Sequence, residues 1–265
     1  MKKYWTIISI YWQRALTYRF TVLSYRVGEA GETLVLILMW IAIYGGDRTM
    51  ISGFTVREMI TYILVGNFFN AMIRNFLSMV IEKDIKDGRL SMFIVKPMSY
   101  FSYILSQEIG RISFSTISSV LTSGFVILCF ANTFIWKFDG VYFLVISIMV
   151  ILAFITELLL SYLVGLIAFW TDEVGGLYAT IDRIKKFFSG GYFPLNLLPV
   201  VFVNISFALP FAYSFFIPAQ LYLKKFDVTV GLKGLLVQCC WILILYGIIK
   251  IVWNRGLKKY EGVGM

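Results

Sequence analysis

The sequence predicts an all-α polytopic membrane protein with six transmembrane helices, an N-terminal amphipathic interfacial helix, and short re-entrant helices between the fifth and sixth spans. The 265 residues are 59% apolar and have a mean hydropathy of +0.81, which exceeds what a soluble domain of this size carries. Charged residues gather in short stretches between long apolar runs, as the loops of a membrane protein require. We therefore expect one transmembrane domain over residues 1–265.

Several functional classes do not fit the composition. The chain contains no histidine, which removes the commonest metal ligand and general base, so we predict neither a metal site nor catalytic residues. The net charge of +9 is expected of cytoplasmic loops and gives no support for nucleic-acid binding. The three cysteines lie in apolar runs and are interpreted as small apolar side chains.

The N-terminal segment, residues 1–20, is predicted to be an amphipathic helix on the cytoplasmic membrane surface. Trp5, Ile8 and Trp12 recur on one face. Bases at both ends of the segment supply positive charge near the lipid headgroups.

The first two spans are predicted over Val22–Tyr44 and Glu58–Val80. The cytoplasmic third of the first span carries Arg26 and Glu29, whose i, i+3 spacing allows the two side chains to pair. Polar residues recur on one face of the second span, where they are expected to face protein or water. These residues are Asn67, Asn70 and Arg74.

The stretch Glu82–Pro97 is the most charged run in the chain, which predicts a cytoplasmic loop over residues 82–97. After Gly88, three apolar residues at i, i+3, i+4 spacing predict a short helix with one apolar face. They are Leu90, Phe93 and Ile94. Pro97 ends this helix, because the residue before proline is pushed out of the helical region. The apolar face indicates either a docking partner or a loop that lies on the headgroups.

The third and fourth spans are predicted over Ile112–Ala131 and Val141–Trp170. The fourth span carries one isolated carboxylate, Glu157. A carboxylate at this depth is expected to be protonated or paired, and Arg74 is the partner that we expect within this chain.

The region before the last span is the least regular. Charged residues at 182–186 lie where the fifth span should begin, and no charge occurs from Phe187 to Leu223. Prolines divide the uncharged stretch into pieces of about ten residues, or roughly 15 Å of helix, which is half a bilayer. We predict a fifth span from near Leu177 to Gly191, then short re-entrant helices over residues 191–233 at the outer face. The residues that mark this outer region are Gly190, Gly191, Pro194, Pro199, Pro210 and Pro218.

The last span is predicted over Leu235–Trp253, which places both termini in the cytoplasm. Sixteen Lys and Arg residues then fall on the cytoplasmic side and six on the outer side, in agreement with the positive-inside rule. Lys224 and Lys225 are a local exception on the outer side.

Three stretches resemble type-2 ABC exporter permeases. Asp84–Ser99, DIKDGRLSMFIVKPMS, is similar to the family pattern D-I-x-x-G-x-L-x-x-x-L-x-K-P. Gly190–Gln220 resembles the pattern G-x-x-x-P-L-x-x-x-P followed by L-P-F-x-Y and a further proline, and Trp253–Gly264 resembles the usual ending. The charged residues of Ile181–Lys186 depart from the family, whose fifth span is mostly apolar.

The resemblance implies a non-catalytic permease subunit of an ATP-driven exporter in the cytoplasmic membrane of a prokaryote. ATP and Mg would bind to two copies of a separate ABC ATPase, which explains why the chain has no P-loop. A second permease subunit, identical or a similar sister chain, and membrane lipid are the other expected partners. The residues expected to couple to the ATPase are Asp84, Ile85, Gly88, Arg89, Leu90, Phe93, Ile94, Lys96 and Pro97.

Members of this family export drugs, antibiotics, toxic peptides, lipids and glycans. The aromatic content of 18% favours an amphipathic or hydrophobic cargo. Asn67, Asn70, Arg74 and Glu157 are interpreted either as interhelical hydrogen-bonding groups or as part of a pathway. Two alternatives stay open: a secondary transporter that uses Glu157 as an ion site, and a membrane-embedded enzyme, for which the sequence shows no polar catalytic cluster.

Overall fold

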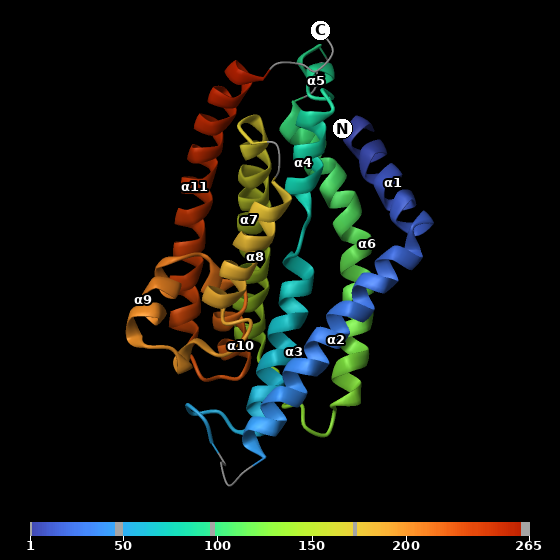
Figure 1. Cartoon of the computed structure of the whole chain (residues 1–265). Helices are drawn as coiled ribbons and strands as arrows, with labels where there is room; N and C mark the ends of the chain where they lie inside the picture. The colour runs from blue at the N-terminus through green and yellow to red at the C-terminus, as the bar shows by residue number, and fades with distance from the viewer. Residues whose placement is uncertain (1, 46–49, 96–98, 172–173, 261–265) are drawn as a thin grey trace.

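The computed structural model describes residues 2–45, 50–95, 99–171 and 174–260, and its architecture is a bundle of α-helices (Figure 1). Across these four ranges no β-strand occurs, and the β-type pairing found there is an isolated bridge between Ile51 and Phe54. The predicted all-α class is therefore confirmed. The helices are α1 (Lys2–Thr17), α2 (Arg19–Tyr44), α3 (Val56–Ile73), α4 (Leu77–Lys86), α5 (Ser91–Val95), α6 (Tyr100–Cys129), α7 (Gly140–Leu166), α8 (Gly175–Ser189), α9 (Val200–Ala208), α10 (Phe216–Tyr222) and α11 (Val228–Lys259).

Local sequence fixes where three of the helices begin. Thr55 and Glu58 form a capping box at the start of α3, in which the Glu58 carboxylate accepts a hydrogen bond from the Thr55 backbone N–H at 2.9 Å. Asp139 caps α7 by accepting from the Val141 N–H at 3.1 Å. Ser99 caps α6 through the Ser102 N–H at 3.2 Å.

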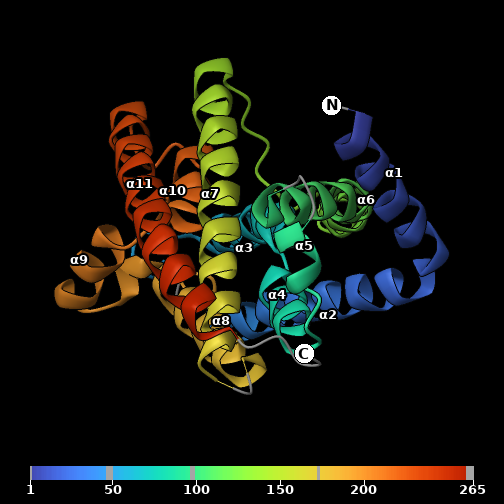
Figure 2. The ribbon, with the colours of Figure 1, turned by 90° about the horizontal axis from the view of Figure 1, so that it is seen from above.

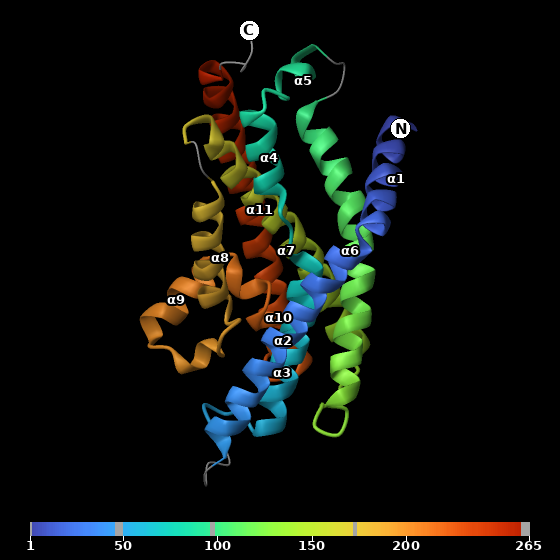
Figure 3. The same cartoon turned by 45° about the vertical axis from the view of Figure 1, so that its right-hand side comes forward.

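Within the described part of the chain, five helical segments are long and apolar enough to cross a membrane. They are Arg19–Tyr44, Val56–Lys86, Tyr100–Cys129, Gly140–Phe169 and Val228–Lys259. Helices α7 and α11 pack along each other, as do α6 and α1, while α3 contacts α2, α6 and α7. Seen from above, α3 lies between the α7–α11 pair and the group of α1, α2 and α6 (Figure 2). The beginning of α1 and the end of α11 lie at the same end of the molecule as α5 (Figures 1 and 3).

The predicted fifth span differs from the structure. Helix α8 occupies this place but has only 15 residues, or roughly 22 Å, against a hydrocarbon core of about 30 Å. It ends at Gly190, whose φ of +81° is the left-handed conformation that favours glycine. A sixth apolar segment is present only if Val200–Ala208 and Phe211–Tyr222 are taken together, and these are bent by 78°.

The prolines of this region mark helix starts and turns. Pro194 and Pro199 directly precede a 3₁₀ turn and α9, and Pro210 precedes the 3₁₀ turn Phe211–Tyr213. Pro218 is the third residue of α10, where its missing N–H costs no intrahelical hydrogen bond. The predicted division into short helices is confirmed, while their re-entrant position in a bilayer stays a prediction.

The second span is broken in a way that the sequence did not predict. Helix α3 ends at Ile73, and Arg74 has an extended backbone with ψ of 131°. The Asn75 side chain accepts a hydrogen bond from the Leu77 N–H at 3.1 Å, and the Tyr178 hydroxyl donates to the Asn75 carbonyl at 2.7 Å. These bonds satisfy backbone groups that the break frees, so no proline or glycine is needed.

Helix α1 contacts α6, and it does so with the face of α1 that was expected to meet lipid. The Trp12 ring lies edge-on to Phe114 of α6, with ring centroids 5.6 Å apart. A Cβ at Gly110 would lie 2.5 Å from the carbonyl oxygen of Ile8, so glycine permits this close approach. Trp5 stays 73% exposed. Helix α1 is therefore docked along α6 (Figure 3).

The apolar core consists of two clusters of buried residues. One gathers around Tyr62, Phe215 and Phe216, and the other around Tyr162 and Phe169. Along α3 and α4 the first cluster takes residues up to 65 and the second begins at residue 77. The polar residues described next, Asn67, Asn70 and Arg74, lie between these two positions.

Candidate functional site

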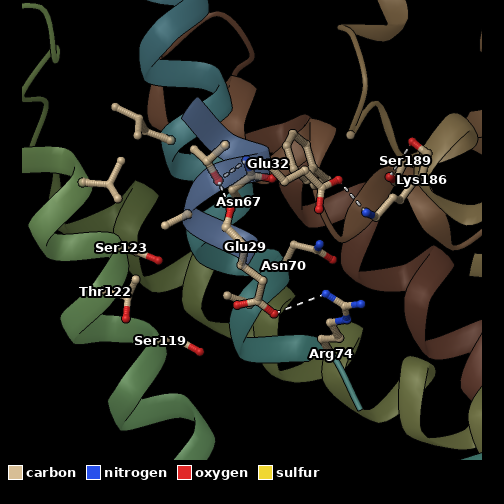
Figure 4. A pocket seen from close by; sticks show the side chains of 17 residues that line it. Glu29, Glu32, Asn67, Asn70, Arg74, Ser119, Thr122, Ser123, Lys186 and Ser189 are labelled. Carbon is tan, nitrogen blue, oxygen red and sulfur yellow. Dashed lines mark hydrogen bonds and ion pairs between the residues drawn. The ribbon is translucent and has the colours of Figure 1, made fainter. Parts of the chain in front are cut away.

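A small polar cavity lies between α2, α3, α6 and α8 (Figure 4). Its volume is about 60 Å³. The polar residues that line it are Glu29, Glu32, Thr33, Asn67, Asn70, Arg74, Ser119, Thr122, Ser123, Lys186 and Ser189. Three of the four polar residues predicted to line a pathway or join helices, Asn67, Asn70 and Arg74, therefore meet at one site.

Glu29 is the acceptor at the centre of one charge cluster. It pairs with Arg26 one turn earlier in α2, as the i, i+3 spacing predicted. Its other carboxylate oxygen lies 3.2 Å from a guanidinium nitrogen of Arg74. Arg26 also donates to the Ser115 hydroxyl at 2.5 Å. The cluster thereby joins α2 to α3 and α6.

Lys186 forms the second ion pair at the cavity. Its ammonium lies 2.7 Å from the Glu32 carboxylate, and Figure 4 shows this pair on the α8 side. The Glu32 side chain is 46% exposed and that of Lys186 is 24% exposed, so the pair lies at the mouth of the cavity. Nearby, the Asn67 amide donates to the Thr33 hydroxyl at 3.0 Å.

Glu157 has a different partner from the one predicted. It pairs with Lys185 of α8, which also lies 3.4 Å from Asp182. Arg74, the expected partner, bonds to Glu29 instead. Glu157 faces a second hollow, which it shares with Asn70, Arg74 and Lys185. Two of the charges at 182–186, Lys185 and Lys186, are thus the partners of acids on neighbouring helices.

Hydroxyl groups form the α6 wall of the cavity. Ser119 and Thr122 donate their protons to backbone carbonyls of α6 at 2.9 Å each. Their oxygens therefore face the cavity mainly as acceptors. The Asn70 amide, on the α3 side, has no side-chain hydrogen-bond partner among the residues that the structure describes.

The predicted coupling loop forms a second ordered polar region. Asp84 is 7% exposed and accepts from the Tyr100 hydroxyl at 3.1 Å. Its other oxygen lies 3.0 Å from Arg89. Gly88 has a φ of +72°, so this turn requires glycine or a strained residue. The turn closes with a hydrogen bond from the Leu90 N–H to the Asp84 carbonyl at 3.2 Å.

Part of the apolar face of this loop packs within the chain. Leu90 is 1% exposed and Ile85 is 5% exposed. The Phe93 ring lies 4.6 Å from the Tyr103 ring and 5.3 Å from the Tyr100 ring. Leu90 is thus covered by the chain itself, and Phe93 is half-buried against two rings of α6. Lys96 and Pro97 lie outside the described residues, and so does the Ile94 side chain.

An aromatic cluster connects this loop to the rest of the bundle. Tyr100 stacks on Trp253 of α11 with ring centroids 5.7 Å apart and an interplanar angle of 13°. Trp253 also lies 6.4 Å from Tyr162 of α7. A displacement of the α5 region would therefore reach α6, α7 and α11 through direct ring contacts.

These features define an integral membrane protein of the transporter type, with apolar helices around a polar, charge-paired interior. The sequence matches the ABC-2 family transporter protein family over residues 30–264. The chain belongs to this family, whose members are membrane components of ABC transporters. A comparison with curated proteins gave no match.

Proposed function

We propose that this chain is the permease subunit of an ATP-driven exporter that moves an amphipathic or hydrophobic compound, such as a drug, antibiotic or toxic peptide, out across the cytoplasmic membrane of a prokaryote. Membership of the ABC-2 family supports the transport role. The observation that carries the proposal is the cavity between α2, α3, α6 and α8, where ion pairs occupy the interior of otherwise apolar helices. A lipid or glycan cargo is the alternative within the same family.

The α5 end of the molecule is the surface that we assign to the ATPase. Its buried residues make the loop rigid, and its exposed residues, Lys83, Lys86, Asp87 and Met92, offer charge with one apolar contact. ATP and Mg would bind to the two ATPase copies. Closure of these ATPases would push on α5, and the contacts from Phe93 to Tyr100 and from Tyr100 to Trp253 would pass that movement to α6 and α11.

A second permease, identical or similar, would complete the assembly. In this arrangement α5 and both termini face the cytoplasm. Cysteine labelling in a cysteine-free background tests the orientation: position 86 should react only from the cytoplasm and position 139 only from outside. Reaction of position 86 from outside would contradict it.

The main test is co-purification of the full chain with an ABC ATPase of the same cell, followed by reconstitution in liposomes. We expect candidate cargoes to stimulate ATP hydrolysis and to be exported. The variant Met92→Asp should lower ATPase association, while Met50→Asp, which changes an exposed methionine at the opposite end (60% exposed), should not. Transport driven by an ion gradient without any ATPase would favour the secondary transporter. The ion pair of Glu157 with Lys185 supports a structural role for this acid instead.

A further inference from the structure

The two sides of the polar cavity carry opposite chemistry. Glu29 and Glu32 lie on α2, and beside them the α6 wall presents the hydroxyl oxygens of Ser119 and Thr122, whose protons are already donated to the backbone. Arg74 on α3 and Lys186 on α8 lie across from this wall (Figure 4). One side therefore accepts hydrogen bonds and attracts cations, and the other donates hydrogen bonds and attracts anions.

Each charged group of the cavity has a partner that a ligand could replace. Arg74 and Lys186 each bond to one carboxylate, at 3.2 and 2.7 Å. A guanidinium has five donors and an ammonium three, so both keep unused hydrogen-bonding capacity. A ligand with only one charge would free one member of an ion pair and leave the other without compensation, and the partial exposure of these side chains reduces this cost without removing it. A ligand with both charges could bond to both members.

We propose that the cavity binds the zwitterionic head of an amphipathic compound, with its ammonium against Glu29, Glu32 and the α6 hydroxyls and its anionic group against Arg74, Lys186 and the Asn70 amide. This inference rests on the proposed function and narrows the class of cargo. The cavity of about 60 Å³ is far below the roughly 300 Å³ of a pocket that encloses a drug-sized molecule. It therefore takes a headgroup only, and the apolar part of the compound stays outside.

The Glu32–Lys186 pair gives the headgroup its entrance. Both side chains are partly exposed at the mouth, and the pair links α2 directly to α8. An entering zwitterion replaces the pair with two ligand contacts, so the mouth opens without stranding a charge.

Two sources of such a head are distinguishable: a zwitterionic phospholipid and a zwitterionic compound without phosphate. The test is calorimetric titration of the full chain in non-ionic detergent with four short-chain probes. These are a phosphatidylethanolamine, an alkyl betaine, an anionic phosphatidylglycerol and an alkyl trimethylammonium. We expect at least one zwitterion to bind ten or more times more tightly than both singly charged probes. If only the phosphatidylethanolamine binds tightly, the ligand is a zwitterionic phospholipid. If the betaine also binds tightly, the cavity accepts zwitterionic compounds without phosphate as well.

Two variants and one control complete the test. Asn70→Leu removes an amide that makes no side-chain hydrogen bond within the described residues, so folding is retained, and Lys186→Gln removes the charge at the mouth. Each should weaken zwitterion binding at least fivefold. The control Lys224→Gln, which changes a lysine that does not line the cavity, should leave binding unchanged. Equal binding of all four probes, or unchanged binding in both variants, would overturn the inference. Because no ATPase takes part, these results are independent of whether the chain couples to one.

Discussion

Two charged segments of this chain illustrate how differently a polar run can be used. The run at 82–97 has an apolar face that was expected to meet either a docking partner or the lipid headgroups, and Leu90 of this face is buried against its own chain. The run at 182–186 had no expected role, yet Lys185 and Lys186 bind Glu157 and Glu32 on two other helices. Charged residues in a largely apolar segment therefore marked side chains that form ion pairs with other helices. The apolar residues of the loop did not by themselves show which surface they contact.

The largest effect should come from leaving Glu157 without its base. In Lys185→Met the acid stays largely buried without its ion-pair partner, and loss of one partner of a buried pair costs about 3–5 kcal/mol of unfolding free energy. The double variant Lys185→Met/Glu157→Leu should regain most of this loss, because both charges are gone. Thermal unfolding in detergent measures these effects, with Lys233→Met at an exposed position as the control.

Arg74→Ala tests whether Arg74 or Lys185 is the main partner of Glu157. If Arg74 were the main partner of Glu157, its removal would match the loss in Lys185→Met. We expect a smaller loss, because Arg74 bonds to Glu29, which keeps Arg26 as a second partner. A larger loss in Arg74→Ala than in Lys185→Met would show that this assignment of partners is wrong.

The next effect concerns the apolar face of the loop. Leu90→Ala should cost about 2–5 kcal/mol of stability, because a buried leucine leaves a cavity. Met92→Ala should change stability by no more than about 0.5 kcal/mol, since this side chain is 48% exposed. Thermal unfolding of both variants gives the comparison. Equal stability of the two would mean that the face is free, as first expected.

The sequence predicted the parts that depend on local pattern. The five long segments within the described residues follow from long apolar runs, and the Arg26–Glu29 pair follows from i, i+3 spacing. The shared face of Asn67 and Asn70 also follows from helical spacing within α3, whereas Arg74 lies just past the end of this helix. These predictions need only the geometry of one helix.

The parts that depend on contacts between helices could not be predicted in this way. Glu157 and Lys185 are 28 residues apart, and no spacing rule relates residues on different helices. Their signal was an unmatched acid in one apolar span and unmatched bases in another. The break at Asn75 had no glycine or proline as a sign, because a hydrogen bond from Tyr178, 103 residues later, supports it.

A smaller effect is expected for the exposed ion pair at the mouth of the cavity. Glu32→Gln should lower stability by only about 0.2–1 kcal/mol, because partly exposed pairs are screened by solvent. The same pair contributes more to function if it opens for cargo. Transport should therefore fall more than stability does, as measured by export in liposomes beside thermal unfolding. If Glu32→Gln lost as much stability as Lys185→Met, the Lys186 pair would be as important for folding as the buried Lys185 pair, contrary to this prediction.

The smallest effect concerns Asp139 at the end of the molecule opposite α5. The hydrogen bond from Lys224, at 2.8 Å, holds the pKa of the Asp139 carboxyl below its ordinary value of 3.8. A carboxyl with a lowered pKa in the folded state stabilises the protein at higher pH and loses that contribution as the pH falls through the folded-state pKa. Wild type should therefore unfold at a slightly higher temperature than Asp139→Asn at neutral pH, and the difference should disappear as the pH falls through the lowered folded-state pKa of Asp139. Asp227→Asn is the matched control, because this exposed carboxylate at the start of α11 makes no capping hydrogen bond. A difference between wild type and Asp139→Asn that persists in acid would mean that Asp139 acts through its cap on α7 and not through Lys224.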